Sequence, residues 1–248
     1  MKRKFLMILI ILIFLSVSLS AFERIEFRDD NYFNVNSGEY DKFLDELSAM
    51  ISFNQDAPAE SLGLIGLNIK LNFKIASIDD NSGRWNSAVR VNSLPSSSFI
   101  CPQLIITKGL PHDIDISAMY MPVIGADMTI GGAAIKWAFI DGGMLIPAVA
   151  IRAAYSTTVE KTNFKAENID LNLSISKDLG IITPYGFIGC NYGRISNIKT
   201  IINPISGNDK TSLNYGAGAR ISIGLININA SVLYDKKPVY SISTGLGF

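Results

Sequence analysis

Apolar and polar residues alternate strictly along many segments between residue 62 and the C-terminus. In the segment 67–75 every odd-numbered residue is apolar, and every even-numbered residue is Asn or Lys. Successive side chains of a β-strand point to opposite faces, so this pattern predicts a strand with one apolar and one polar face. Seven segments show the pattern clearly and three (98–108, 126–139 and 181–193) show it weakly. Together they predict ten strands, at 67–75, 98–108, 113–120, 126–139, 149–156, 169–176, 181–193, 213–223, 226–234 and 240–248.

The connections between these segments alternate between tight and longer ones. Every second connection is a tight turn that carries glycine, as in Gly109–Pro111 and Gly224–Leu225. Both long connections, 79–97 and 194–211, belong to the other set. Short turns at one end and longer loops at the other are typical of an outer-membrane barrel, in which the short turns are periplasmic. With ten strands, both ends of the barrel chain fall on the short-turn side.

The period changes from 2 to 3.6 in residues 21–60. The segment 41–53 carries one apolar stripe, which predicts an amphipathic helix, and Ser37 is a candidate N-cap. The helix could enter the barrel from the periplasm as a plug, or lie on the periplasmic rim or the membrane surface. We expect it to pack at or inside the periplasmic mouth, because its apolar stripe needs a partner surface.

The first residues have the layout of a secretory signal peptide. Lys2, Arg3 and Lys4 precede an unbroken apolar run over 5–15, and small residues follow. We expect cleavage after Ser20, with Ala21 as the alternative. The apolar run is shorter than the roughly 20 residues of a membrane-spanning helix, which argues against an uncleaved anchor. The predicted organisation is a signal peptide at 1–20, a periplasmic segment at 21–60 and a barrel at 61–248.

Composition narrows the possible functions. Apolar residues make up 48% of the chain and charged residues 18%, which excludes a disordered chain. The 22 basic and 22 acidic residues balance, so no nucleic-acid partner is expected. One His and two Cys nearly exclude zinc and iron–sulfur centres. Cys101 and Cys190 could form a disulfide in an oxidising compartment, but two unpaired small residues are the favoured interpretation.

The final segment, 239–248, alternates apolar and polar residues and ends on Phe248, and the segment 183–189 reads Thr-Pro-Tyr-Gly-Phe-Ile-Gly. In both features, and in its dyad alternation, the chain resembles the bacterial outer-membrane β-barrel superfamily over residues 62–248. Segment 57–67 also looks like a block found in a small group of such proteins. A soluble β-sandwich would alternate too, but it would explain neither the terminal Phe248 nor four tyrosines near strand ends. Those tyrosines are Tyr120, Tyr155, Tyr234 and Tyr240.

This resemblance implies an all-β fold, a closed antiparallel transmembrane barrel of about ten strands (eight to twelve), in the outer membrane of a Gram-negative bacterium. It implies contact with outer-membrane lipid, and recognition of the last strand by the barrel assembly machinery. The residues of that assembly signal would be Tyr240, Ile242, Leu246 and Phe248.

The polar faces of the strands would line the lumen. The charged residues expected there are Lys70, Lys74, Asp113, Asp115, Lys136, Arg152, Asp170 and Arg220. Neither sign dominates, so we expect these charges to pair across the lumen. Two interpretations stay open at this point: a closed core of ion pairs, or a narrow water-filled pore lined by the same residues.

No constellation of residues indicates catalysis. Barrel enzymes mostly use a His base near the outer rim, whereas the single His112 falls in a predicted periplasmic turn. Acidic pairs at 79–80 and 208–209 do not have the spacing of an EF-hand. We therefore predict a non-enzymatic, porin-like protein without cofactor or metal, forming a narrow or plugged passage for small solutes. The alternative is a closed structural or adhesion-type barrel acting through extracellular loops 79–97 and 194–211.

Overall fold

The structure of the protein is a computed structural model. It describes residues 32–33, 37–79, 85, 98–123, 128–143, 145–159, 165–196, 199–200 and 209–247. The predicted signal peptide, at 1–20, lies outside these residues and stays a prediction.

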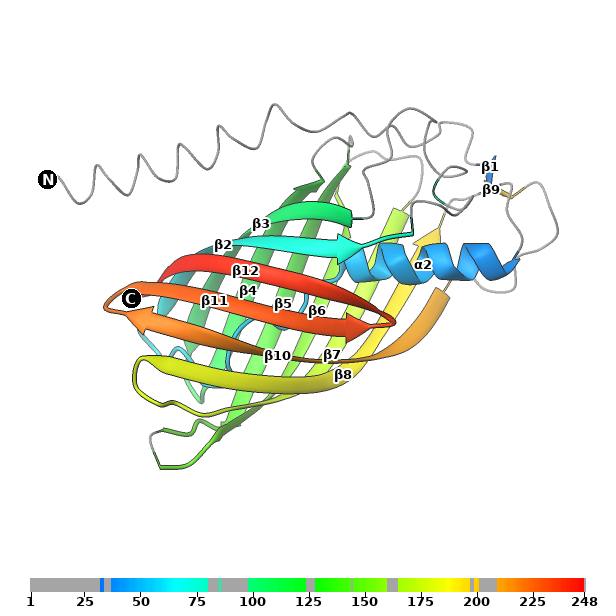
Figure 1. The fold of residues 1–248 in the computed structure, drawn as a ribbon. Coiled ribbons are helices and arrows are strands. Elements are labelled where there is room, and N and C mark those ends of the chain that lie inside the picture. Colours follow the sequence, from blue (N-terminus) through cyan, green and yellow to red (C-terminus); the bar gives the residue numbers. More distant parts are fainter. Residues whose placement is uncertain are drawn as a thin grey trace, which may run out of the picture.

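Ten long antiparallel strands form a closed barrel (Figure 1). Each strand pairs with its neighbours in the chain, and the last strand of the barrel pairs with the first, for example Ile242 opposite Phe73. The strands are β2 (Leu67–Ser77), β3 (Ser98–Leu110), β4 (Ile114–Val123), β5 (Met128–Ile140), β6 (Ala148–Thr158), β7 (Lys165–Ser176), β8 (Ile182–Ser196), β10 (Asp209–Ile223), β11 (Ile226–Asp235) and β12 (Lys237–Gly247). All ten predicted strands are confirmed, including the three with weak alternation.

Among the described residues, three elements lie outside the barrel sheet. The helix α2 covers Ser37–Ile51, and the two-residue strands β1 (Tyr32–Phe33) and β9 (Lys199–Thr200) pair in parallel. The sequence did not predict β1 and β9, because two residues are too few to show a period.

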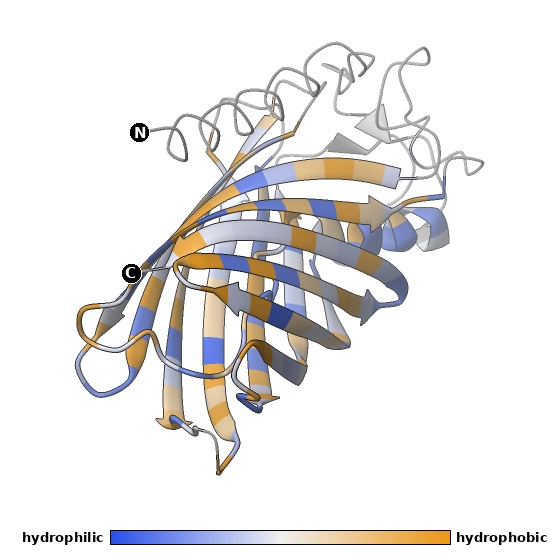
Figure 2. Cartoon of the chain, turned by 60° about the vertical axis from the view of Figure 1, so that its left-hand side comes forward, coloured by the Kyte–Doolittle hydropathy of each residue, from blue (hydrophilic) through white to orange (hydrophobic). Residues whose placement is uncertain are grey.

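The outer face of the barrel is apolar. Every second residue of the strands points outward, and large aliphatic residues dominate these positions, such as Ile116, Leu171 and Ile188. Figure 2 shows the resulting alternation of apolar and polar positions along the strands. The four tyrosines predicted near strand ends are all exposed on this face, by 39% to 52%. Because the sheet is closed, no strand edge is left with unpaired backbone N–H and C=O groups. The apolar exterior requires lipid around it, so the fold is a transmembrane β-barrel.

The two ends of the barrel differ. One end carries the turns between β3 and β4, β5 and β6, β7 and β8, and β10 and β11, together with the C-terminal end of β12. The turn after β3 is tight, with left-handed backbone at His112 and Asp113. The other end carries the connections between β2 and β3, β4 and β5, β6 and β7, and β8 and β10, and also the tight turn at Lys236 between β11 and β12. We call these the short-turn end and the long-loop end.

Candidate functional site: a plugged lumen

Residues 37–60, which we call the plug, occupy the lumen. They begin with α2, which covers the predicted 41–53 apart from its last two residues. Among the described residues, no helix is long and apolar enough to cross a membrane. The apolar stripe of α2 is fully buried, and Phe43, Leu44, Leu47 and Met50 each expose 1% or less. The helix therefore has the buried partner surface that its stripe requires.

At the long-loop end, α2 packs against an apolar patch inside the barrel. Trp85 is completely buried there, and its ring lies 4.9 Å from that of Phe43 and 5.0 Å from that of Phe99. The helix also passes very close to β8, because a Cβ atom on Gly193 would overlap Ser48. Glycine at this position lets helix and wall come into contact.

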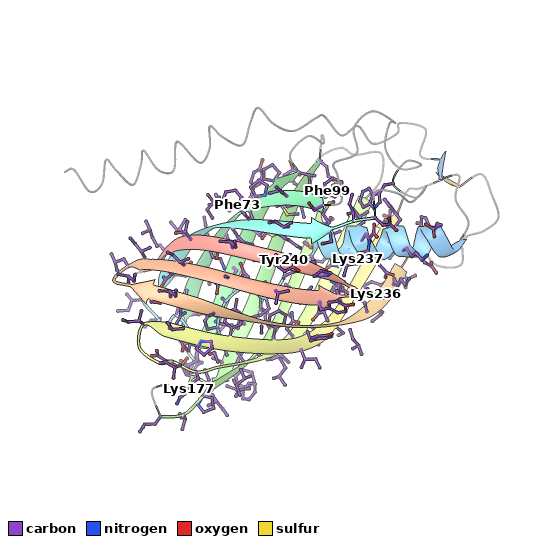
Figure 3. The ribbon with its side chains drawn as sticks, in the orientation of Figure 1. Phe73, Phe99, Lys177, Lys236, Lys237 and Tyr240 are labelled. Carbon is purple, nitrogen blue, oxygen red and sulfur yellow. The ribbon has the colours of Figure 1, made fainter. Side chains whose placement is uncertain are left out.

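Charged residues surround α2 at the mouth. The carboxylate of Asp45 lies 2.9 Å from Lys210 Nζ and 2.7 Å from Lys236 Nζ. Glu46 lies 2.6 Å from Lys237 Nζ. In Figure 3, Lys236 and Lys237 lie beside α2, whereas Lys177 lies at the opposite end of the barrel. On the helix itself, burial and the neighbouring Asp41 raise the pKa of Tyr40 to about 12, so this phenol stays neutral.

These contacts correct the expected position of the helix. We expected it at the same mouth as the C-terminus, but α2 lies at the long-loop end, away from the C-terminus (Figure 1). The chain then crosses the lumen and reaches the short-turn end, where β2 begins at Leu67. The sequence located the apolar stripe but not its partner, which is the buried apolar cluster around Trp85 and Phe99 at the long-loop end.

Polar wall residues hold the middle of the plug by its backbone. Lys74 Nζ donates to the carbonyls of Met50 (3.1 Å) and Ser52 (2.9 Å). Arg152 donates to the carbonyl of Phe53 (2.7 Å) and lies 4.5 Å above the centre of its ring. These donors satisfy carbonyls in the last turn of the helix and directly after it.

Ion pairs hold the last part of the plug. Asp56 lies 2.7 Å from Lys70 Nζ, and Glu60 lies 2.6 Å from Arg220 Nη2. Lys136 Nζ donates to the carbonyl of Glu60 (2.5 Å) and pairs with Asp115 (2.9 Å). Among the described residues, no backbone-to-backbone hydrogen bond joins the plug to a strand. The plug is thus attached through side chains, and its removal would leave the barrel ladder intact.

Little space is left beside the plug. One cavity of about 60 Å³ lies between Asp56, Glu60, Lys70, Lys136 and Arg220. A second, of about 40 Å³, reaches up to Phe53 and Arg152. Each has room for only a few water molecules. Neither cavity is large enough to hold a solute beside the plug.

The structure places seven of the eight predicted lumen residues inside the barrel, and Asp113 in the exposed turn before β4. The expectation that these charges pair with one another was largely wrong. Of these eight residues, only Lys136 and Asp115 form an ion pair with each other, and Asp170 accepts hydrogen bonds from Asn172 and Asn214. The other partners come from the plug, and Asp56 and Glu60 were missed. The available signal was the acidic character of residues 21–60.

The remaining predictions fall on single residues. His112 is exposed in its turn, as expected. Cys101 and Cys190 are free thiols, and they point to opposite faces of the barrel wall. In β12, Tyr240 and Ile242 face outward, and Phe248 lies outside the described residues. Asp80 and Asn208 lie outside them too. The described residues contain no group of three or more side chains suited to a metal ion.

The sequence and fold are similar to the following proteins. A family model described as "Family of unknown function (DUF6588)" matches residues 15–248. No curated protein matches the sequence. Solved structures with a similar fold include Ail of Yersinia pestis, at 12% identity and a TM-score of 0.37, covering 74% of this chain and 99% of that one. They also include OprG of Pseudomonas aeruginosa, at 14% identity and a TM-score of 0.38, covering 76% and 99%. A third is outer membrane phospholipase A of Escherichia coli, at 10% identity and a TM-score of 0.33, covering 82% and 97%. Such distant similarities carry no function to this chain.

Proposed function

This chain belongs to the family of unknown function DUF6588, and from its plugged lumen we propose a gated, non-enzymatic passage for small polar solutes across the bacterial outer membrane. The gate is the plug, residues 37–60. The long-loop end faces outward and the short-turn end faces the periplasm, as in other outer-membrane barrels.

The observation that supports this proposal is the way the plug is attached. A permanent core is held by close packing along its whole length. Here α2 is packed in that way, whereas residues 52–60 place only Phe53 and Ala59 in apolar clusters and contact the wall mainly through ion pairs and through side-chain hydrogen bonds to their carbonyls. Water can replace each of these contacts when the plug moves.

The wall behind the plug suits a water-filled passage. Small polar residues face the lumen on many strands, including Ser174, Thr183, Asn229 and Ser243. With the plug displaced, these side chains could hydrogen-bond to water. Ten strands give a narrow barrel, so the passage would admit small solutes only.

The test is single-channel conductance of the full mature chain in planar bilayers. The variant Asp56→Asn/Glu60→Gln cuts two ion pairs between plug and wall. A charge-assisted hydrogen bond contributes about 1.5–3 kcal/mol, so the open probability should rise at least about tenfold. The unchanged protein should open rarely.

The control is Asp178→Asn/Glu167→Gln, which also removes one Asp and one Glu charge, but outside the lumen. Asp178 lies in a short turn, and Glu167 pairs with Lys165 on the outer surface. Its conductance should equal that of the unchanged protein. The proposed passage would be refuted if neither the unchanged protein nor the plug variant conducts, although heat-shifted gel mobility shows that both are folded. The closed adhesion-type barrel would then be favoured.

A further inference from the structure

Charge is divided unequally between the plug and the wall. Residues 37–60 contain six acidic residues and one basic residue, Lys42. Lys42 pairs with Glu39 inside the helix, at 3.1 Å, and so does not contribute to the wall contacts. The plug is therefore a polyanion relative to its surroundings.

The ion pairs between plug and barrel all have the same polarity. In each, a plug carboxylate meets a basic residue of the barrel, and these pairs are Asp45 with Lys210 and Lys236, Glu46 with Lys237, Asp56 with Lys70, and Glu60 with Arg220. Within the described residues no pair runs the other way. The balanced total charge of the chain conceals this separation.

A lumen without the plug would be cationic. Its basic residues on the described strands are Lys70, Lys74, Lys136, Arg152 and Arg220, and its acidic residues are Asp115, Asp170 and Asp235. The carboxylates of Asp113 and Asp141 lie in turns at the rim and bind Ser61. Lys210, Lys236 and Lys237 add positive charge at the long-loop mouth.

The positive charge is concentrated at one level of the lumen. Lys70, Lys136 and Arg220 line the same cavity, and Asp115 is the one wall carboxylate that lines it among the described residues. Asp115 pairs with Lys136. Departure of the plug would therefore leave Lys70 and Arg220 without carboxylate partners, in a narrow lumen inside a low-dielectric wall. Such a site concentrates counter-ions strongly.

We propose that the open lumen selects small carboxylate anions, and that Asp56 and Glu60 occupy their positions in the closed state. This inference rests on the proposed passage and names its substrate class. A guanidinium such as that of Arg220 binds a carboxylate with two parallel hydrogen bonds, and Lys70 supplies a second cation across the same cavity. A permeating anion would then compete directly with the plug for these two residues.

The test compares two full-length variants that cut the same ion pairs from opposite sides. Asp56→Asn/Glu60→Gln removes the plug charges and keeps the wall cations. Lys70→Gln/Arg220→Gln removes the wall cations and keeps the plug charges. Both should open more often than the unchanged protein. The reversal potential in a potassium chloride gradient, and then with acetate in place of chloride, gives the selectivity.

The plug variant should prefer both chloride and acetate over potassium by about fivefold or more, because the cationic site remains. In the wall variant, the permeability ratio of anion to potassium should be near one or below it. The single variant Arg220→Gln, which disturbs a partly exposed pair, should lie between them. Lys165→Gln/Lys177→Gln removes two cations outside the lumen and should leave the selectivity unchanged.

The outcomes separate the two proposals. The anion selectivity would be overturned, while the passage stands, by equal anion-to-potassium permeability ratios in the two double variants. A preference of the plug variant for potassium would have the same meaning. If no variant conducts although every barrel is folded, the passage and the selectivity would both be overturned. Chloride permeation with acetate excluded would overturn the carboxylate as the substrate class.

Discussion

At the scale of single residues, the plug is held by donors from the wall and carbonyls from its own backbone. Lys74 illustrates this, because the residue is only 1% exposed and its ammonium group donates to the carbonyls of Met50 and Ser52. A buried ammonium is costly unless all its donors are used. The same holds for Arg152 above Phe53. These residues fix the path of the plug while the ion pairs fix its ends.

Gly193 sets the distance between α2 and β8. Gly193→Val should push α2 away from the wall, because the new side chain would occupy the position of Ser48. Overpacking of this kind costs about 1–3 kcal/mol, and the plug alone bears it. We expect faster proteolytic cleavage within residues 37–60 and an unchanged heat-shifted mobility of the barrel.

Gly186 provides the matched control for that variant. It lies on the same strand, and a Cβ there would make an ordinary contact, 3.7 Å from the carbonyl of Gly216. Gly186→Ala should leave plug cleavage unchanged. Equal cleavage rates in Gly193→Val and in the unchanged protein would show that the helix does not depend on this close approach.

At the scale of elements, each strand has one face for lipid and one for the lumen, and both faces constrain its sequence. Tyr185 and Phe187 of β8 show the inward face, where their rings stack at 6.4 Å. The ring of Phe187 fits there because Gly216 on β10 has no side chain. Ile188, the residue after Phe187, points to lipid. The two faces of β8 thus meet two different environments, the filled lumen and the lipid.

Ile188→Lys tests the lipid face near the middle of β8. A lysine at the bilayer midplane costs about 2–4 kcal/mol, so the free energy of unfolding in lipid vesicles should fall by that amount. Leu145→Lys is the control, because Leu145 is 94% exposed in the short turn after β5. Its cost near the interface should be about 0–1 kcal/mol. Equal costs at the two positions would argue that β8 does not face lipid.

The strands could be predicted from the sequence, and the path of the plug could not. Alternation is imposed on every strand by its two environments, which is why even 98–108 and 126–139 were placed. The plug is fixed largely through backbone carbonyls, such as those of Met50 and Phe53, and a carbonyl leaves no mark in the sequence. The lumen cations were identified, but their partners were sought on other strands rather than in residues 37–60.

At the scale of the whole molecule, α2 and the C-terminus of the barrel lie at opposite ends (Figure 1). The helix begins at the long-loop end, and residues 52–66 run the length of the lumen before β2 starts. With the orientation typical of outer-membrane barrels, α2 is then presented toward the outside of the cell.

Cysteine labelling in intact cells tests this topology, in a background that carries Cys101→Ala and Cys190→Ala. Lys42→Cys should react with a membrane-impermeant maleimide, because the Lys42 side chain is 60% exposed on α2. Leu179→Cys, in the short turn after β7 and 64% exposed in the folded chain, should react only after the outer membrane is permeabilised. The reverse pattern would place α2 in the periplasm.

The pairing of β12 with β2 has a consequence for biogenesis. This seam joins the first and last strands of the barrel, so it is the strand pairing with the greatest separation along the chain and the slowest to form. The plug directly precedes β2 and is present before β12 is made. A sheet that curls around a docked helix never has to thread a chain through a finished ring. We therefore expect the plug to act as an internal template, around which the assembly machinery closes the wall.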